Sequence, residues 1–360
     1  MTNWKTYKLG DVCSRLRSGK GIPASEVSAC GKFAVVGGNG VRGYTDTSNF
    51  NGQCVVVGRQ GAYCGNVRYF DGEFYMTEHA VVIVGNELAD THFLAYLLST
   101  MHLGQLSAQS AQPGLSVRTL SKLEISLPSL EEQRRIAGIL GAIDDKIENN
   151  CRINTNLELQ AQALYKQCFV DSPTVKLGDV VITTSGGTPS RSHMEFYVGK
   201  YGWVKSKELN SSFITKTEET ITDDAIAKSA AKLLPAKSIL IAMYGATVGQ
   251  YAILSQPMTC NQAVCALLPN ENYPYTYLFM VAKNIKEELA NKAIGSAQQN
   301  ISQVIIKDID ISSDIEKIKQ FHKIVCPHFE VMEKNQKENE TLATLRDTLL
   351  PKLMNGEIKL

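Results

Sequence analysis

One stretch of the chain, residues 129–169, has the hydrophobic pattern of a single long helix. Apolar side chains recur at helical spacing, with no Gly-Pro break, at Ile136, Ile139, Leu140, Ile143, Ile147, Leu157 and Leu164. Ser129 and Glu132 form an S-x-x-E capping box directly after Pro128, which predicts a sharp helix start. About 40 residues at roughly 1.5 Å each give a rod about 60 Å long. Such a rod is typical of a spacer or a coiled-coil arm, and we place it at 129–170.

A second stretch, residues 313–360, has the same pattern. Ser313 and Glu316 form another capping box, and an apolar face follows at Ile318, Phe321, Ile324, Val325, Phe329, Met332, Leu342, Leu345 and Leu349. Because proline lacks an amide donor and clashes with the preceding turn, we expect a kink or a broken first turn near Pro327. The asparagine-rich run 149–156 in the first helix indicates a place where register against a partner helix is set.

The two long helices follow two halves that are related in sequence. Four matches occur in the same order, at offsets of 168 to 186 residues: YKLGDV at 7–12 with VKLGDV at 175–180, GAYCG at 61–65 with GATVG at 245–249, SAQPGLS at 110–116 with SAQQNIS at 296–302, and the two capping boxes. The segments between these anchors differ, since residues 19–50 have no counterpart in residues 186–209. A duplicated frame with different inserts indicates two sites of one kind that recognise different things.

Each half mixes short strands with helices. Strand-like apolar runs bounded by turn residues lie at 33–36, 54–57 and 80–84, and later at 238–242 and 264–268. Helical patterns follow at 91–105 and 275–293, and closing strands are predicted at 123–127 and 309–311. We therefore expect an α+β chain, with globular units of mixed α/β structure at 1–128 and 171–312 and long helices at 129–170 and 313–360.

The composition of the chain limits the kinds of partner that it can bind. The chain has 37 basic and 36 acidic residues, so a nucleic-acid surface must be a local patch. No apolar run is long enough to cross a membrane, and the start MTNWKTYKLGD lacks the apolar core of a signal peptide. The nine cysteines are scattered, and neither Cys260 with Cys265 nor Cys326 with its neighbouring histidines has a zinc-site partner pair. We expect a cytoplasmic protein without a bound metal.

Motifs for catalysis are weak. Residues 38–43 spell G-x-G-x-x-G, but a turn-rich polar stretch follows where a dinucleotide fold needs a helix. No P-loop and no Asn/Asp-Pro-Pro-aromatic motif of an amino-methyltransferase occur. For a nuclease, the carboxylates of Asp308, Asp310 and Glu357 are better interpreted as solvated or structural.

Polar side chains gather on or beside the predicted glycine-rich loops, at corresponding places in both halves. Arg and Lys can hold phosphates, while Arg, Asn and Gln can pair with base edges. In the first half the candidate DNA-binding residues are Arg15, Arg17, Lys20, Asn39, Arg42, Arg59, Gln60, Tyr63, Asn66, Arg68, His79 and Gln112. In the second half they are Thr188, Ser190, Arg191, Lys205, Ser206, Lys207, Tyr244, Thr247, Asn261, Gln262, Gln298, Gln299 and Asn300.

Several motifs together resemble one family, the specificity (S) subunits of type I restriction-modification systems. They are L-P-x-L-x-E-Q-x-x-I at 127–136, the segments SGGTPS at 185–190 and WVKS at 203–206, GATVG at 245–249 with Asn261-Gln262-Ala263, and TLRDTLLPKLMNG at 344–356. GRQGAYCGNV at 58–67 and TEHA at 77–80 resemble another subtype of the same domain. The second long helix departs from the first at Lys317-Ile318 and Pro327.

The resemblance implies a non-catalytic subunit with two target-recognition domains. Each would read one half of a split, asymmetric site in double-stranded DNA, and the two helices would pack as an antiparallel coiled coil that sets the spacer. The helices would also dock two adenine-methylating modification subunits, which supply S-adenosylmethionine, and restriction subunits would bring ATP and Mg²⁺. The chain itself would hold no cofactor. Candidate docking residues are Leu130, Glu132, Gln133, Ile136, Leu140, Phe321, Leu345 and Leu349.

Two other classes stay open at this point. One is a fragment of a fused restriction-modification enzyme or a cryptic nuclease. The other is a coiled-coil scaffold whose globular units bind protein or mimic DNA, although a mimic should be strongly acidic and this chain is nearly neutral.

Overall fold

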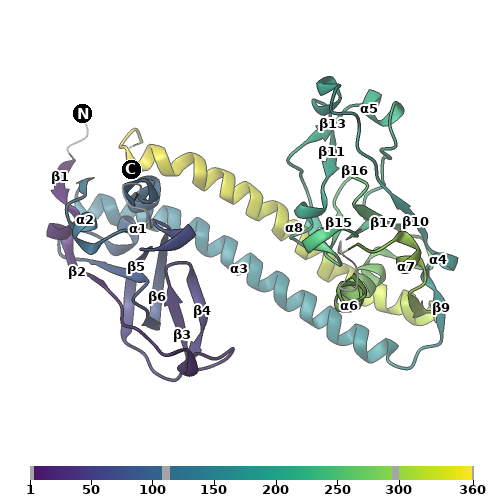
Figure 1. The fold of residues 1–360 in the computed structure, drawn as a ribbon, viewed down its shortest axis with the longest axis horizontal. Helices are drawn as coiled ribbons and strands as arrows, with labels where there is room; N and C mark the ends of the chain where they lie inside the picture. The colour runs from purple at the N-terminus through teal and green to yellow at the C-terminus, as the bar shows by residue number, and fades with distance from the viewer. Residues whose placement is uncertain (1–3, 108–113, 294–299, 359–360) are drawn as a thin grey trace. The chain divides into compact units, whose positions relative to one another are not determined.

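The chain divides into two compact units, each of which includes part of both long helices. The computed structural model describes residues 4–107, 114–293 and 300–358 (Figure 1). The first unit comprises residues 1–146 and 342–360, and the second unit comprises residues 147–341. Long helix α3 spans Leu130–Phe169, and long helix α8 spans Ile315–Met354. The mixed α+β class predicted from the sequence is confirmed.

The first unit contains a six-stranded sheet of order β2-β7-β5-β6-β3-β4 and a two-stranded sheet, β1-β8. Its strands are β1 (Lys5–Lys8), β2 (Cys13–Ser18), β3 (Phe33–Gly37), β4 (Gly40–Thr45), β5 (Phe50–Gly58), β6 (Val67–Met76), β7 (Ala80–Gly85) and β8 (Glu124–Leu127). Its short helices are α1 (Thr91–Thr100) and α2 (Val117–Ser121). Helix α1 packs with Val55, Val57 and Ile83 on one face of the sheet, together with Ile136 and Leu140 of α3.

The second unit contains a five-stranded sheet of order β10-β17-β14-β15-β12, a three-stranded sheet, β13-β11-β16, and the pair β18-β9. Its strands are β9 (Thr174–Lys176), β10 (Ile182–Ser185), β11 (Tyr201–Val204), β12 (Phe213–Ile214), β13 (Thr220–Ile221), β14 (Ile239–Ala242), β15 (Tyr251–Leu254), β16 (Thr259–Cys260), β17 (Val264–Leu268) and β18 (Asp310–Ser312). Its helices are α4 (Leu177–Val180), α5 (Asp223–Ala227), α6 (Tyr275–Ala293) and α7 (Gln303–Lys307).

Helices α3 and α8 run antiparallel within the second unit. The side-chain nitrogen (Nδ2) of Asn150 donates to Asn339 Oδ1 at 2.8 Å, and that of Asn335 donates to Asn154 Oδ1 at 2.8 Å. Residue numbers therefore rise along α3 while they fall along α8. Asn150 and Asn335 are buried, so the asparagine-rich run does hydrogen-bond the partner helix, as its sequence predicts.

The start of α8 differs from expectation, and the helix does not break at its proline. Asp314, not Ser313, caps α8, because Asp314 Oδ1 accepts from the Lys317 amide at 3.1 Å. The helix continues through Pro327 without a break. Pro327 is exposed, as is Lys323, whose carbonyl loses its amide partner, while buried Val325 and Phe329 hold the helix on either side. A bend at Pro327 stays a prediction.

The duplicated frame is visible in the backbone. Strand β1 pairs antiparallel with β8, and β9 pairs antiparallel with β18. In each case the next residue continues the ladder: the Leu9 amide donates to the Leu123 carbonyl, and the Leu177 amide donates to the Ile309 carbonyl, both at 2.8 Å. In each half, the repeated KLGDV motif begins at the last residue of a strand and continues into a helical turn. The strand that precedes the long helix pairs with this first strand.

The repeated GAYCG and GATVG motifs form the same turn twice. Gly61 and Gly245 have φ of 71° and 69°, and Gly65 and Gly249 have φ of 82° and 79°. The first turn is closed by donation from the Gly65 amide to the Gly58 carbonyl at 2.7 Å. The second is closed in the same way, from the Gly249 amide to the Ala242 carbonyl at 3.0 Å. We call these two segments, 61–65 and 245–249, the glycine turns.

The two glycines of a turn carry different constraints. A Cβ at Gly61 would have no neighbour within 4 Å, whereas a Cβ at Gly65 would lie 2.1 Å from the Gly104 nitrogen. We therefore expect Gly61→Ala to cost about 1 kcal/mol, for the left-handed backbone alone. Gly65→Ala should cost about 3 kcal/mol or more, because a steric clash is added. Thermal unfolding of the full chain, followed by circular dichroism, compares the two variants, and equal losses would contradict this account.

Candidate nucleic-acid interface

One face of the six-stranded sheet carries arginines among small apolar side chains. Arg17 on β2, Val82 on β7, Val56 on β5 and Arg68 on β6 are direct cross-strand neighbours, so they form one row on one face. Arg15, two residues before Arg17, has its guanidinium 4.9 Å from the centre of the Phe50 ring. The sequence places Arg15, Arg17, Arg42 and Arg68 on or beside loops, but all four lie within strands.

Other candidates meet at one end of this sheet. The Arg59 guanidinium donates to Ser18 Oγ at 3.3 Å, and the Arg59 amide donates to the His79 carbonyl at 3.2 Å. The His79 ring hydrogen-bonds Gln60 Oε1 at 3.2 Å. Asn39 is exposed in the turn between β3 and β4, and a Cβ on its neighbour Gly38 would lie 3.0 Å from the His79 carbonyl. Three separate segments therefore converge here.

The first unit leaves its candidate arginines and lysine without acidic partners, whereas the candidate His79 lies 3.2 Å from Glu78. Among the residues that the structure describes, no carboxylate lies within ion-pair distance of Arg15, Arg17, Lys20, Arg42, Arg59 or Arg68. Burial, and secondarily the nearby Arg17, lower the pKa of Arg15. These side chains are placed to attract an anionic polymer.

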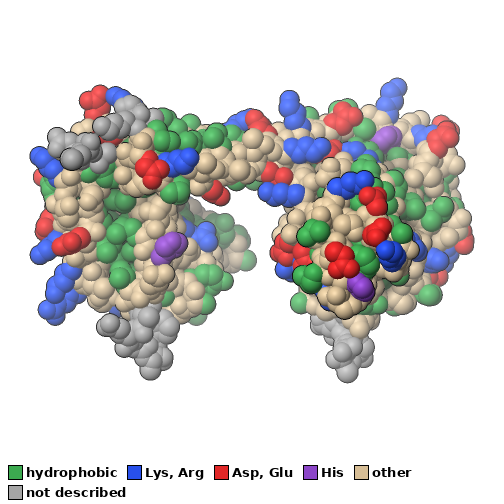
Figure 2. All heavy atoms as spheres, turned by 90° about the horizontal axis from the view of Figure 1, so that it is seen from above, with side chains coloured by type: hydrophobic (Ala, Val, Ile, Leu, Met, Phe, Trp, Pro, Cys, Tyr) green, Lys and Arg blue, Asp and Glu red, His purple; other side chains and the backbone are tan. Residues whose placement is uncertain are grey.

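The second unit pairs its candidate cations with two adjacent carboxylates. Arg191 binds Glu219 at 2.8 Å, Lys205 binds Glu219 at 2.7 Å, and Lys207 binds Glu218 at 2.7 Å. Hydrogen bonds from Lys205 and Arg191 lower the pKa of Glu219, and hydrogen bonds from Lys207 and Lys205 lower that of Glu218. Figure 2 shows basic and acidic side chains side by side on the second unit, at the right of the view.

Two of these cations, Arg191 and Lys205, lie over the ring of the buried Trp203. The Arg191 guanidinium lies 4.0 Å from the centre of the Tyr197 ring and 5.2 Å from that of Trp203. The Trp203 indole nitrogen donates to the Gly187 carbonyl at 3.0 Å, which ties β11 to the SGGTPS segment. Glu218 and Glu219 were not predicted from the sequence, because nothing local to residues 218–219 signals that they meet residues 191 and 205.

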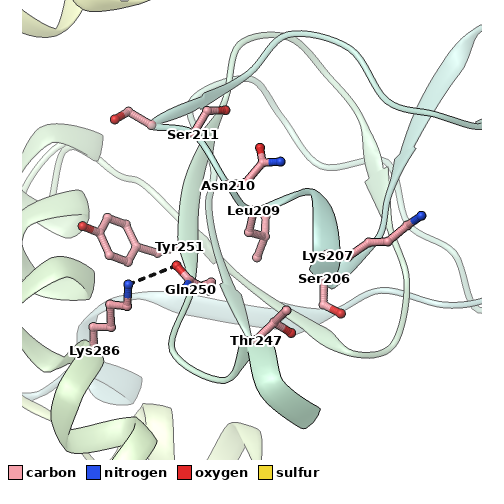
Figure 3. Close-up of a pocket in the computed structure, with 10 residues that line it drawn as sticks. Ser206, Lys207, Leu209, Asn210, Ser211, Thr247, Gln250, Tyr251 and Lys286 are labelled. Carbon is pink, nitrogen blue, oxygen red and sulfur yellow. Dashed lines mark hydrogen bonds between the residues drawn. The ribbon is translucent and has the colours of Figure 1, made fainter. Parts of the chain in front are cut away.

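The remaining candidates of the second unit form two small groups. Thr188 hydrogen-bonds Gln262, and Ser190 hydrogen-bonds Ser192, all on exposed loops. Ser206, Lys207 and Thr247 line a pocket of about 450 Å³ together with Gln250 and Lys286, which sequence reasoning missed (Figure 3). Asn261 accepts from the Ala263 amide within its own turn, at 3.1 Å.

The residue before each glycine turn pairs with one residue of the corresponding repeated segment, 110–116 or 296–302. Gln60 forms an isolated antiparallel bridge with Gly114, and Tyr244 forms one with Asn300. Tyr63 and Tyr244 are both exposed beside these bridges, and Asn66 is half-buried. Gln112, Gln298 and Gln299 lie outside the residues that the structure describes.

Half of the candidate docking residues are part of the interior. Ile136, Leu140 and Phe321 are fully buried in the hydrophobic clusters of their own units. Gln133 is also buried: it accepts from the Asp90 amide at 2.9 Å and donates to the Leu88 and Pro128 carbonyls at 3.0 Å. The glutamine of the E-Q motif therefore fixes α3 to its own unit. Because Gln133, Ile136, Leu140 and Phe321 are all buried, they offer no surface to a partner. Leu345 is exposed, and Leu130, Glu132 and Leu349 are half-buried.

The described residues offer neither a metal-binding cluster nor a membrane-spanning helix. No cluster of three or more His, Cys, Asp or Glu side chains that could hold a metal ion occurs there. Asp308 and Asp310 both pair with Lys176, at 3.3 and 3.2 Å, which is a structural role. In the same part of the chain, every helix is too short or too polar to span a membrane.

Comparison with known proteins assigns the class. Residues 1–159 and 170–320 each match the family model described as the type I restriction modification DNA specificity domain. The chain therefore belongs to this family. The sequence-based resemblance is thereby confirmed, and the chain falls among specificity subunits rather than among the catalytic components of restriction systems.

Individual relatives agree with this assignment. The specificity subunit of the type I restriction enzyme HindI, from Haemophilus influenzae, is 26% identical over 388 residues, which cover 82% of this chain and 84% of that protein. The EcoprrI specificity subunit of Escherichia coli is 34% identical over 179 residues, but the match spans only 48% of this chain and 44% of that protein. The crystal structure of a type I S subunit from M. genitalium superposes with a TM-score of 0.71 at 18% identity, covering 98% of this chain and 96% of that chain. That likeness shows a shared fold.

Glu218 and Glu219 should weaken the attraction of the second unit for duplex DNA, because they neutralise its candidate cations. Glu218→Gln with Glu219→Gln frees Arg191, Lys205 and Lys207, so binding to duplex DNA should tighten. The slope of log affinity against log salt should steepen by roughly 0.9 for each cation that gains a phosphate. Fluorescence polarisation across a salt series measures both.

A matched control removes the same charge elsewhere in the unit. Asp223 and Asp224 form ion pairs with Lys200 and Lys228, which are not candidate residues. Asp223→Asn with Asp224→Asn should leave the salt slope nearly unchanged. If the two double variants behaved alike, net charge rather than the Glu218–Glu219 pair would be responsible.

Proposed function

We propose that this chain is the DNA sequence-specificity subunit of a type I restriction-modification complex. Each unit reads one half of a bipartite, asymmetric DNA site, and the chain performs no chemistry itself. The observation that carries the proposal is the pair of glycine turns, which have the same backbone hydrogen bonds but different side chains around them. One backbone device with two sets of polar groups is suited to reading two different sequences.

The side chains available to the two units support different half-sites. In the first unit, Arg59, Gln60 and His79 converge, and an arginine row crosses the sheet. In the second unit, Thr188 and Gln262 lie on exposed loops near the Trp203 cluster. Arg, Gln and Asn side chains can pair with base edges in the major groove, and Lys and Arg can position the backbone phosphates.

The partners follow from the family and are proposals for this chain. Two adenine-methyltransferase modification subunits would dock along the long helices, where Leu345 provides an exposed apolar side chain. Restriction subunits would complete the complex. S-adenosylmethionine, ATP and Mg²⁺ would belong to these partners, and the assembly would act on DNA in the cytoplasm.

We further propose that the long helices act as a ruler for the unread spacer. Each contains 40 residues, or about 60 Å of helix at 1.5 Å per residue, which is under two turns of duplex. The buried asparagine pairs support this role, because they favour one register of α3 against α8.

Replacing residues 1–125 by the first unit of another family member should change one half-site only, because each unit makes its own base contacts. Selection from random duplexes, with the modification subunits present, identifies the preferred site of the parent and of the hybrid. Failure of the parent to enrich a split motif would sink the proposed function. A change in both half-sites would refute modular reading, and Mg²⁺-dependent cleavage by the purified chain alone would favour a nuclease.

Deleting seven residues from each long helix should shorten the unread spacer and leave both half-sites intact, since two helical turns are removed while the apolar stripe keeps its phase. The same selection measures the spacer. Deletion from α3 alone, which breaks the asparagine pairing, serves as the control and should lower stability. An unchanged spacer after the paired deletion would mean that the helices only dock partners.

A further inference from the structure

Each unit has a pocket beside its glycine turn, and the two pockets correspond. The pocket of the second unit is lined by Thr247, Gln250, Tyr251 and Lys286 among others, and that of the first unit by Tyr63, Asn66, Val67 and His102 among others. These four pairs share one offset of 184 residues, which is also the offset between the glycine turns. The two pockets therefore occupy one place in the duplicated frame.

The correspondence has a steric cause. A Cβ at Gly65 would lie 2.1 Å from the Gly104 nitrogen, and a Cβ at Gly249 would lie 2.8 Å from the Lys286 carbonyl oxygen. In both units the last glycine of the turn, Gly65 or Gly249, thus allows close backbone contact with another segment. That segment carries the basic residue of the pocket, His102 or Lys286. The pocket forms at this contact, so it is built by the repeat.

The pocket of the second unit has two lysines among hydroxyl and amide side chains. Lys286 comes from α6 and donates to Gln250 Oε1 at 3.1 Å, and Asn210 and Lys207 also line the pocket (Figure 3). Lys207 is held by Glu218, but no carboxylate of the described residues lies within ion-pair distance of Lys286. A backbone phosphate, which carries a negative charge, matches a lysine without a carboxylate partner better than a neutral base edge does.

We propose that the two pockets are equivalent sites for a backbone phosphate of DNA, one for each half-site, in which Lys286 supplies the cation in the second unit and His102 takes the same place in the first. The inference rests on the proposed function. It adds that these positions hold the duplex without choosing its sequence. Neither residue belongs to the sets that sequence reasoning singled out.

The test measures affinity and its salt dependence for the full chain with its modification subunits. Lys286→Ala should weaken binding to specific and random duplexes alike and reduce the salt slope by about 0.9, while the selected sequence stays unchanged. The affinity deficit of the variant should therefore shrink roughly 3.5-fold between 50 and 200 mM salt. Lys292→Ala is the matched control: it lies on the same helix, outside the pocket, and is already paired with Glu288, so its slope should remain that of the parent.

A reciprocal variant tests the equivalence. His102→Lys gives the first pocket the cation of the second, so it should steepen the slope by a similar amount. An unchanged slope in both Lys286→Ala and His102→Lys would overturn the assignment while leaving specific DNA binding, and the proposed function, in place. A changed half-site in Lys286→Ala would also overturn it, in favour of base contact.

Free phosphate compounds are separated by a direct measurement. Inorganic phosphate is titrated calorimetrically into the full chain and into its Lys286→Ala variant. The two should give the same signal, because the pocket does not bind free phosphate. Such binding at millimolar concentration would assign the pocket to a free anion instead. Loss of all DNA binding by the parent would defeat the proposed function itself.

Discussion

The structure depends on the packing of α3 against α8, because neither helix can bury its apolar stripe alone. In the second unit Phe321 and Phe329 of α8 lie in one core with Ala161 of α3 and with Tyr277 and Phe279 of α6. In the first unit Ile136 and Leu140 of α3 share a core with Leu353 and Met354 of α8. Both globular units thus complete their interiors with residues from both helices, and they cannot be separated from the helices without exposing apolar surface.

Polar groups decide how this packing is aligned. The buried Asn150 of α3 donates a hydrogen bond to Asn339 of α8, and the buried Asn335 of α8 donates one to Asn154 of α3. A slip by one turn would leave buried amides without partners, at about 1–3 kcal/mol for each group. Apolar stripes tolerate such a slip far better. The asparagines therefore supply the alignment, while the apolar residues supply the stability.

The duplicated frame holds two different electrostatic surfaces. The candidate arginines and lysine of the first unit form no ion pair in the described part of the chain, whereas Glu218 and Glu219 pair with Arg191, Lys205 and Lys207 in the second. A neutralised cation contributes less to general attraction for an anionic polymer, so hydrogen bonding and shape carry more of the recognition in the second unit. The near balance of charge over the whole chain conceals this difference.

The sequence by itself determined the repeat, the two long helices and several of the longer buried strands, because helical and strand periodicity and turn glycines act over a few residues. It did not indicate the short strands, such as β11, β13 and β16. It also indicated the class of protein, through motifs that occur together in order. Only the tertiary structure decided which polar residues meet. Gln133 became part of the interior, Arg17 and Arg68 became neighbours across a sheet, and Lys286 entered a pocket with Thr247. These contacts join residues far apart in the chain, and no local pattern encodes them.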